Sequence, residues 1–311
     1  MVGVLPIRIV KFNASSVLIG LMTFKCVCIV VGVLGNLSVI IYNVFLNHDK
    51  TPTSVFVVNL AITDVFACLS IYPIWIAEFA QILNRVDADE TVFCKISSPT
   101  GTLAVSLSIL TLLAITLDRY IFLTWPLKYP TIMTWPRTYC LVGAIWSAAL
   151  AYFPLSVLYT EEGEYRSKCY LPILLFLFCA VIYVFTPIIV IIVLNYKMFS
   201  LARDQRRKIA VNSLSSNSST SSNSVNETRR RIARGLKTIK TFGIVIGVFL
   251  MCLTPFITAV AVEFFCRSCV PYALFIILGD LVVINSIFNP FIYGIRQKEY
   301  RNAFRRLFLA C

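Results

Sequence analysis

The chain has 311 residues, of which 58% are hydrophobic and 14% are charged. This apolar content excludes a soluble globular domain and indicates a protein whose solvent is lipid. A net charge of +13 is also found in nucleic-acid-binding proteins. Here the basic residues are distributed as in a membrane protein, so we do not expect nucleic acid as a partner.

Seven apolar runs are each long enough to cross a bilayer as a helix, which takes about 20 residues. The runs cover residues 17–46, 53–81, 92–124, 136–158, 172–200, 238–264 and 272–295. The first run begins too late and is too long for a cleaved signal peptide, so we expect it to be retained. The sequence therefore predicts an all-α membrane protein, with a seven-transmembrane helix bundle over residues 17–295 and a tail over residues 1–16.

Basic residues gather on one side of these runs. If residue 1 is outside, the inner segments hold Lys50, Lys128, Arg137, Lys197 and two clusters over residues 203–240 and 296–306. The outer segments hold only scattered bases, namely Arg8, Lys11, Arg85, Lys95, Arg166, Lys168 and Arg267. Positive charge favours the cytoplasmic side of a membrane. We therefore expect a multi-pass plasma-membrane protein with an extracellular amino terminus.

Four of the eleven cysteines fall on the outer side, and an even number there permits two disulfides. One would join Cys94 to Cys169 and tie the second outer loop over the bundle. Cys266 and Cys269 are close enough to bridge locally, although two free thiols remain the alternative. The single histidine, His48, lies on the inner side, so we do not expect a zinc site.

Three segments outside the runs have distinct compositions. Residues 204–234 include a stretch of Ser, Asn and Thr between basic flanks, which predicts a disordered cytoplasmic loop with helical extensions at both ends. Residues 296–311 predict an amphipathic helix on the lipid of the inner leaflet, where Cys311 is either palmitoylated or an unmodified thiol. Asn13 begins an outer Asn-Ala-Ser sequence, which is typical of N-glycosylation.

The third run ends in the sequence Asp118-Arg119-Tyr120. A charged pair at the edge of a membrane helix is costly unless it has partners. We expect Asp118 to hold Arg119 in one conformer, while a cytoplasmic partner can take Arg119 in another. The alternative is a pair that only anchors the helix in the headgroups.

Taken together, the runs resemble the rhodopsin-like (class A) G-protein-coupled receptors. Each run supplies a residue at a spacing typical of that family: Asn36, Asp64, Asp118-Arg119-Tyr120, Trp146, Pro187, Pro255 and Asn289-Pro290-Phe291-Ile292-Tyr293. The resemblance implies that Asp118, Arg119 and Tyr120, the loop residues Pro126 and Leu127, and Asn289, Pro290 and Tyr293 form the switch for G-protein coupling.

The resemblance also implies two sites within the bundle. One is a sodium pocket that favours the inactive state, made of Asp64, Ser108, Asn285, Ser286 and Asn289. Its alternative is a hydrated polar network without a specific ion. The other site is a transmission triad of Ile109, Pro187 and Phe249, for which the alternative is ordinary core packing.

Three positions depart from the family's pattern near the switch. Leu253 stands where the family usually has Trp, and Asn195 stands where it usually has Tyr. Gly235 stands where many members have the Glu that pairs with the motif arginine across two helices. These departures predict raised basal activity.

The ligand positions that the resemblance implies are mostly apolar: Gly101, Thr102, Val105, Phe256, Ile257, Val260, Phe275 and Gly279. Gly101 stands where amine receptors have Asp, and Val283 where opsins have the retinal lysine, so we expect neither a standard amine receptor nor a visual pigment. The pocket suits a small or lipophilic ligand. Lys25, Glu78 and Asp280 are expected to meet near it, either in a mutual salt bridge or around a charged ligand group.

The expected partners are an extracellular ligand and a heterotrimeric G protein, with arrestin and receptor kinases acting on the stretch Ser213–Thr228. No cofactor is expected apart from a sodium ion as an allosteric modulator, and no enzyme activity. A transporter or channel is the alternative class, because it would also explain charges inside the membrane. The sequence shows no inverted repeat in support of that alternative.

Overall fold

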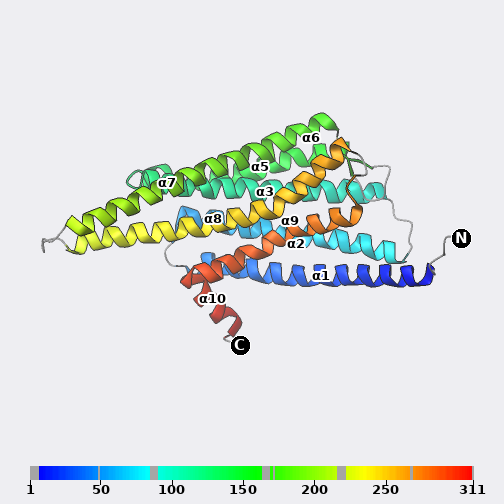
Figure 1. Cartoon of the computed structure of the whole chain (residues 1–311), viewed down its shortest axis with the longest axis horizontal. Helices are drawn as coiled ribbons and strands as arrows, with labels where there is room; N and C mark the ends of the chain where they lie inside the picture. Colours follow the sequence, from blue (N-terminus) through cyan, green and yellow to red (C-terminus); the bar gives the residue numbers. More distant parts are fainter. Residues whose placement is uncertain are drawn as a thin grey trace.

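A computed structural model of the chain describes residues 7–47, 50–84, 90–162, 169–170, 172–215, 222–266 and 269–309. Within these ranges, seven helical segments are long and apolar enough to span a membrane. Figure 1 shows them running along the long axis of the molecule. The predicted fold class, an all-α seven-helix membrane bundle, is confirmed.

The first three spans are nearly continuous helices. They are α1 (Ile7–Ile41) with the π-helix η1 (Tyr42–Leu46), α2 (Pro52–Asn84) and α3 (Glu90–Thr124). A one-turn helix α4 (Tyr129–Ile132) follows α3, and α5 (Trp135–Tyr159) is the fourth span. The fifth span consists of α6 (Ile173–Cys179), the π-helix η2 (Ala180–Phe185) and α7 (Thr186–Ser215). The sixth and seventh are α8 (Ser222–Phe265) and α9 (Tyr272–Arg296), and α10 (Lys298–Leu309) ends the described chain.

Helix α3 occupies the centre of the bundle. It contacts α2, α5, α7 and α8, whereas α1 contacts mainly α2, α9, α10 and η1 among the described elements. Its side chains Leu107, Ile109, Leu112 and Ile115 are fully buried in the main core cluster. Large apolar side chains on the outer helices are exposed, for example Leu174 and Ile189, and these faces suit contact with lipid.

The helices around the inner loop are longer than the predicted spans. Helix α7 continues to Ser215 and α8 begins at Ser222, so helix covers most of the segment expected to be a disordered loop with helical extensions. At 1.5 Å per residue the 44 residues of α8 extend over about 66 Å, roughly twice the hydrocarbon thickness of a bilayer. Figure 1 shows both helices projecting beyond their neighbours at the end opposite to the amino terminus. Residues 216–221 lie outside the described residues.

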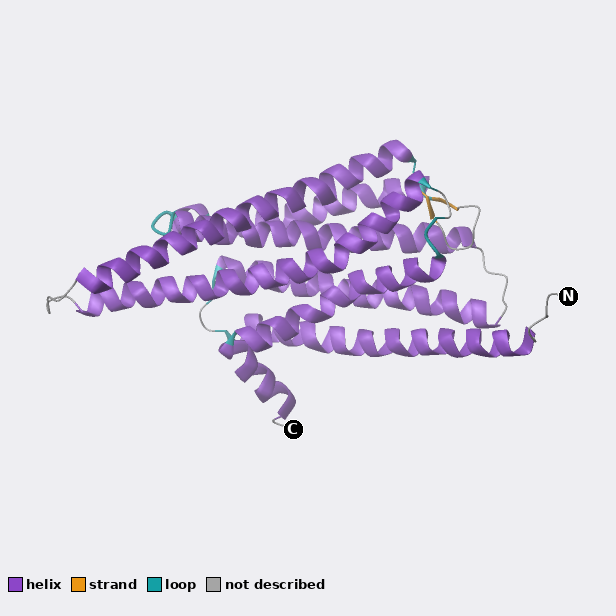
Figure 2. Cartoon of the chain, viewed as in Figure 1, coloured by secondary structure: helices purple, strands orange, loops and turns teal. Residues whose placement is uncertain are grey.

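Two further details differ from expectation. Helix α1 begins at Ile7, so residues 7–16 of the expected tail are helical. The outer loop before the fifth span contains a short antiparallel hairpin, in which β1 (Glu161–Glu162) pairs with β2 (Cys169–Tyr170). Figure 2 shows the strands at the same end of the molecule as the amino terminus.

The last span and α10 meet at a sharp bend. Helix α9 ends at Arg296, and α10 turns away from the long axis of the bundle (Figure 1). Tyr300 and Ala303 of α10 are buried, while Arg301 and Arg305 are exposed. The polar and apolar faces are therefore those of an amphipathic helix.

Candidate functional site

The pair Asp118 and Arg119 is buried at the inner end of α3. Asp118 is fully buried and Arg119 is 8% exposed. The Arg119 guanidinium donates to Asp118 Oδ2 through Nε at 2.9 Å and through Nη2 at 2.6 Å. The guanidinium carbon also lies 5.2 Å from the ring centroid of Phe122. The arginine is thus folded back onto its own helix.

Two residues from other elements complete the coordination of Asp118. Thr53, at the start of α2, donates to Oδ2 at 2.7 Å and also contacts Arg119 Nη2. Tyr129, the first residue of α4, donates to Oδ1 at 2.7 Å. Burial, together with the nearby Asp118 carboxylate, raises the pKa of Tyr129 to about 12, so its hydroxyl remains a donor at neutral pH. Each oxygen of the Asp118 carboxylate therefore accepts from a neutral donor, and Oδ2 also accepts from Arg119.

The loop between α3 and α4 lies open beside this cluster. Leu127 is 94% exposed, and the neighbouring Pro126 and Trp125 are exposed too. Tyr120, one residue past Arg119, is half-buried and packs edge-on against Trp125, with ring centroids 6.2 Å apart. Three consecutive exposed apolar residues, Trp125, Pro126 and Leu127, therefore lie beside the sequestered arginine.

Asp118 and Asn195 show how Arg119 is paired in the absence of the family's usual partners. Asn195 turns to its own helix, where its side chain donates to the Ile191 carbonyl at 2.8 Å. Within the described part of the chain, Asp118 is the only acidic residue in a salt bridge with Arg119. Gly235 lies in α8, but the side chains around it are outside the described residues.

A second buried polar cluster lies in the middle of the bundle, where α2 and α9 meet. Asp64 is fully buried, and Asn289 donates to its Oδ2 at 2.7 Å. Ser286 lies near enough to Asp64 to act on its carboxylate. The remaining predicted members, Ser108 and Asn285, are 6% and 5% exposed.

This cluster contains oxygen atoms without a protein partner. Asp64 Oδ1, Asn285 Oδ1 and Asn289 Oδ1 are buried and have no hydrogen-bond partner among the residues that the structure describes. A buried oxygen without a partner is costly, so such groups are usually met by water or an ion. One carboxylate with several neutral oxygens is the donor set of a small hard cation. The residues predicted for sodium therefore fit that ion.

The cluster is joined to the inner half through α9. Asn36 of α1 donates to the Ser286 carbonyl at 2.9 Å, and a Cβ at Gly35 would lie 3.1 Å from Pro290. Glycine at this position allows α1 and α9 to approach closely. Tyr293, one turn below Asn289, is 2% exposed and packs against Phe242 of α8.

The predicted transmission residues lie in the core between the clusters. Ile109, Phe249 and Leu253 belong to one buried cluster. Pro187 is also buried and lies two residues after the end of the π-helix η2. Proline lacks the N–H of a regular helical turn, and a π-turn is a common adjustment near such a gap.

The predicted ligand positions line the outer half of the bundle. A Cβ added at Gly101 would meet nothing within 4 Å, so there is open space beside this residue. Phe256 and Phe275 pack edge-on at 5.7 Å, and a Cβ at Gly279 would lie 3.9 Å from Phe256. The other predicted positions, Thr102, Val105, Ile257 and Val260, are half-buried.

A separate groove of about 780 Å³ opens between α8 and α9. It is lined by Met251, Thr254, Leu274 and Leu278, among others, and by none of the predicted ligand residues. Met251 is 68% exposed, so this groove faces the outside of the bundle.

The structure brings Lys25 and Asp280 together in a salt bridge near the outer end. Lys25 is fully buried and Asp280 is 6% exposed. Glu78 is half-buried and close enough to act on Lys25 electrostatically. The mutual salt bridge considered from the sequence is therefore present between two of the three residues.

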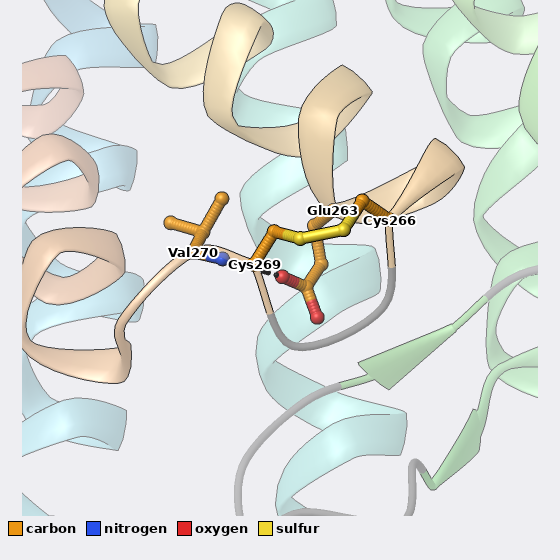
Figure 3. The surroundings of a disulfide bond; sticks show 4 residues. All are labelled: Glu263, Cys266, Cys269 and Val270. Atoms are coloured by element: carbon orange, nitrogen blue, oxygen red, sulfur yellow. Dashed lines mark hydrogen bonds between the residues drawn. A yellow bond between two sulfur atoms is a disulfide. The ribbon is translucent and has the colours of Figure 1, made fainter.

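The outer loops carry the predicted disulfide cysteines. Cys266 and Cys269 are disulfide-bonded, and Glu263 accepts a hydrogen bond at 3.1 Å from the N–H of Val270 beside them (Figure 3). Cys94 is also disulfide-bonded, and the hairpin that contains Cys169 contacts α3. Asn13 lies in α1, and its side chain is outside the described residues.

Several structurally important residues were missed from the sequence. Thr53 and Tyr129 are the donors to Asp118, and Asn43 exchanges hydrogen bonds with Tyr300 of α10 at 2.8 and 3.0 Å. Trp146 donates to Asn59 at 2.9 Å. Thr, Tyr and Asn are common in helices and loops, so only their spatial partners distinguish them.

Comparison with known proteins gives an independent result. The sequence profile of the rhodopsin family of seven-transmembrane receptors matches residues 35–293. The trace amine-associated receptor 13c of Danio rerio is 31% identical over 288 residues, which cover 87% of this chain and 80% of that receptor. The alpha-1A adrenergic receptor of Mus musculus is 28% identical over 90% of this chain and 65% of its own length. The human alpha-1A adrenergic receptor is 27% identical over 97% of this chain and 69% of its own length.

Proposed function

Because the chain belongs to the rhodopsin family of seven-transmembrane receptors, we propose that it relays the binding of an extracellular ligand to a heterotrimeric G protein. The family consists of receptors and not of enzymes, and the seven spans make the chain a multi-pass membrane protein. The extracellular position of the amino terminus is part of the proposal, and the charge asymmetry supports it.

The observation that carries the proposal is the sequestered Arg119. Its guanidinium is engaged by Asp118 and Thr53, and Asp118 is engaged by Tyr129. A charge held by one carboxylate of its own helix and by hydroxyl groups of other elements can be released to a partner when the surrounding helices separate. The exposed loop at Leu127 supplies an apolar contact for the same partner.

The proposed mechanism is a shift between two states of the bundle. Ligand binds in the outer half, Ile109, Pro187 and Phe249 repack, and the inner half of α8 moves away from α3. The ligand shifts the equilibrium only by its difference in affinity for the two states. Because the described contacts of Arg119 include no acid from another helix, we expect a raised basal activity.

The Asp64 cluster is proposed as the site of an allosteric sodium ion. When bound, sodium would supply a positive charge to the buried Asp64 carboxylate. The protein's own part is to hold Asp64 with Asn289 and Ser286 and to offer the oxygens of Asn285 and Ser108. A bound cation would favour the closed inactive arrangement of α2 and α9.

The ligand is proposed to be small or lipophilic. Two of the relatives are named for trace amines and for adrenergic recognition, and an amine-bearing ligand is therefore a natural class to test. The chain nevertheless has Gly101 at the position that holds a carboxylate in amine receptors, so an ammonium group would need a different partner. The open space beside Gly101 supports a ligand site at this depth.

Cytoplasmic regulation is proposed to involve the polar stretch Ser213–Thr228 as the substrate of receptor kinases and the contact for arrestin. Phosphate would add negative charge between basic flanks there. The exposed arginines of α10 suit anionic lipid headgroups at the inner leaflet.

Ligand-free G-protein activation in cells tests the proposed function. Wild type, Arg119→Ala and Arg301→Ala are compared at equal surface expression across a panel of G-protein subtypes. We expect wild-type activity above mock-transfected cells for at least one subtype, because Arg119 lacks a cross-helix acid. Arg119→Ala should fall to the mock level, since the variant lacks the group that the G protein engages.

Arg301→Ala is the matched control, because this arginine is exposed on α10. It should retain wild-type activity. Arg119→Ala activity equal to wild type would contradict the coupling role of Arg119. A silent wild type would contradict the raised basal activity. A transmembrane flux of solute that Arg119→Ala leaves unchanged would favour a transporter.

A further inference from the structure

The buried Lys25 is enclosed by more than its salt-bridge partner. Its ammonium lies 5.5 Å from the ring centroid of Tyr72, 4.6 Å from that of Trp75 and 5.3 Å from that of Phe79. Asp280 of α9 binds it directly. One carboxylate and three aromatic rings therefore converge on a single nitrogen atom.

The sequence of α2 creates this arrangement. Tyr72, Trp75 and Phe79 follow the spacing i, i+3 and i+7, so their rings share one face of the helix. Tyr72 is fully buried and Phe79 is 2% exposed. Trp75 is oriented by its indole N–H, which donates to Ser97 of α3 at 3.1 Å. The rings are thus fixed before any cation is considered.

Gly279 allows α9 to reach these rings. A Cβ at this position would lie 3.1 Å from Trp75, which is tighter than an ordinary contact. It would lie 3.9 Å from Phe256, which is an ordinary contact distance. Glycine therefore brings the next residue, Asp280, beside the aromatic face. Trp75 therefore lies beside the predicted ligand position Gly279, which also faces Phe256.

A salt bridge alone does not require these rings. A buried ion pair can often be replaced by apolar residues without loss of stability, because removing both charges from water is costly. Aromatic faces around an ammonium group are instead the arrangement by which proteins recognise cationic ligands. The surroundings of Lys25 are therefore those of a bound ammonium ligand.

We propose that Asp280 and the rings of Tyr72, Trp75 and Phe79 form a binding site for a primary alkylammonium group, which the chain's own Lys25 fills in this structure. We call these four residues the cation cage. Lys25 acts as a tethered occupant that fastens α1 to α2 and α9. The cage offers the carboxylate that an amine ligand lacks at Gly101.

Two carboxylates act on the ammonium group of Lys25. Asp280 binds it directly, and Glu78 acts on it electrostatically. A ligand ammonium that takes Asp280 would leave Lys25 near the Glu78 carboxylate. This exchange, which rests on the proposed function, assigns amine-bearing molecules as the ligand class.

Thermal unfolding of the purified receptor with n-butylammonium tests the cage, because this ion reproduces the lysine stem and its charge. Among the described residues, Cys28, Cys68, Cys179 and Cys252 are buried free thiols, so their reaction with a thiol-reactive fluorophore follows unfolding once the exposed Cys26 and Cys140 have been blocked. Lys25→Ala should lower the melting temperature, since it leaves Asp280 without its ion pair. n-Butylammonium should restore at least half of that loss, whereas neutral n-butanol should not.

Two variants isolate the parts of the cage. Lys25→Ala with Asp280→Asn should show no response to n-butylammonium, because the carboxylate is gone. Lys25→Ala with Phe79→Leu should need a higher concentration, because one ring is lost. If Lys25 fills the cage nine-tenths of the time, wild type should need roughly tenfold more n-butylammonium than Lys25→Ala.

An equal response of Lys25→Ala to n-butylammonium and n-butanol would overturn the proposal, as would an undiminished response of the variant with Asp280→Asn. If Lys25→Ala does not fold, Lys25→Ser provides the same test, because it also removes the stem and the ammonium group and leaves the carboxylate of Asp280 in place. The measurement requires no G protein. Its failure would therefore leave the proposed receptor function standing.

Discussion

At the scale of single residues, the state of the inner end depends on hydroxyl groups around one carboxylate. Tyr129 and Thr53 each donate to Asp118 at 2.7 Å, and Asp118 in turn holds Arg119. Neither donor lies on α3, so the hydrogen bonds that orient Asp118 toward Arg119 depend on the positions of α2 and α4. A change in those helices therefore reaches Arg119 through hydrogen bonds.

Removing the Tyr129 hydroxyl should raise ligand-free signalling. Tyr129→Phe keeps the ring but loses a hydrogen bond to a charged group, which contributes about 1.5–3 kcal/mol. If the bond forms only in the inactive state, the equilibrium should shift by roughly tenfold or more toward activity. G-protein nucleotide exchange without ligand measures this, with Tyr139→Phe as the control because Tyr139 is 60% exposed. Equal exchange by both variants would show that Tyr129 does not stabilise the inactive state.

Sodium should stabilise the wild-type protein through Asp64. Binding of an ion to the folded state adds about 1.4 kcal/mol at ten times its dissociation constant. We expect the melting temperature in sodium chloride to exceed that in choline chloride at equal ionic strength. Asp64→Asn should abolish the difference, because the carboxamide has no charge. A sodium effect of the same size in Asp64→Asn would rule out Asp64 as the ion's ligand.

Some contacts of single residues could be predicted from the sequence, and others could not. Asp64, Asn285 and Asn289 could be grouped in advance because their spacing along the spans matches a known pattern. Tyr129 could not be assigned to Asp118, since the contact depends on the turn that α4 makes after the loop. The salt bridge between Lys25 and Asp280 was one of two alternatives, because no spacing rule relates residues 255 positions apart.

At the scale of elements, α10 is fastened to the bundle by a polar contact as well as by apolar packing. Tyr300 and Asn43 exchange hydrogen bonds where η1 begins, and Phe304 packs close to Gly294 at the end of α9. Burial raises the pKa of Tyr300, so its hydroxyl stays protonated and can donate. The amphipathic helix is therefore part of the folded bundle.

Tyr300→Phe should loosen α10. The substitution leaves the buried side chain of Asn43 without this partner, which costs about 1–3 kcal/mol. Hydrogen exchange should become faster in residues 298–309 and remain unchanged in α3. Tyr300→Phe combined with Asn43→Leu should recover part of the loss, because it removes both polar groups. Unchanged exchange in α10 after Tyr300→Phe would show that packing alone holds the helix.

The elements were predictable in number and order but less so in their ends. The starts of the spans at Pro52, Trp135 and Tyr272 agree with the starts of their apolar runs to within one residue, because lipid imposes a sharp change in composition there. The extensions of α7 and α8 lie beyond the bilayer, where apolar content no longer marks a helix. The π-helices η1 and η2 depend on local backbone geometry that a hydropathy pattern does not contain.

At the scale of the whole molecule, three polar layers lie along the bundle axis. The cation cage is at the outer end, the Asp64 cluster is in the middle, and Asp118 with Arg119 is at the inner end. Helix α2 contributes residues to all three layers, and α9 contributes to the outer and middle layers. A displacement of α9 by a ligand at Asp280 would therefore be felt at Asn289 and Tyr293.

The central claim is that the inner half of α8 separates from its neighbours when a G protein binds. Spin labels introduced as noncanonical residues at Lys240 of α8 and at Tyr139 of α5, both exposed, would report this distance by pulsed electron resonance. We predict two distances without G protein, with the longer one a minority, and a shift of nearly all molecules to the longer one when nucleotide-free G protein is added. A single distance that stays the same in the G-protein complex would contradict the account.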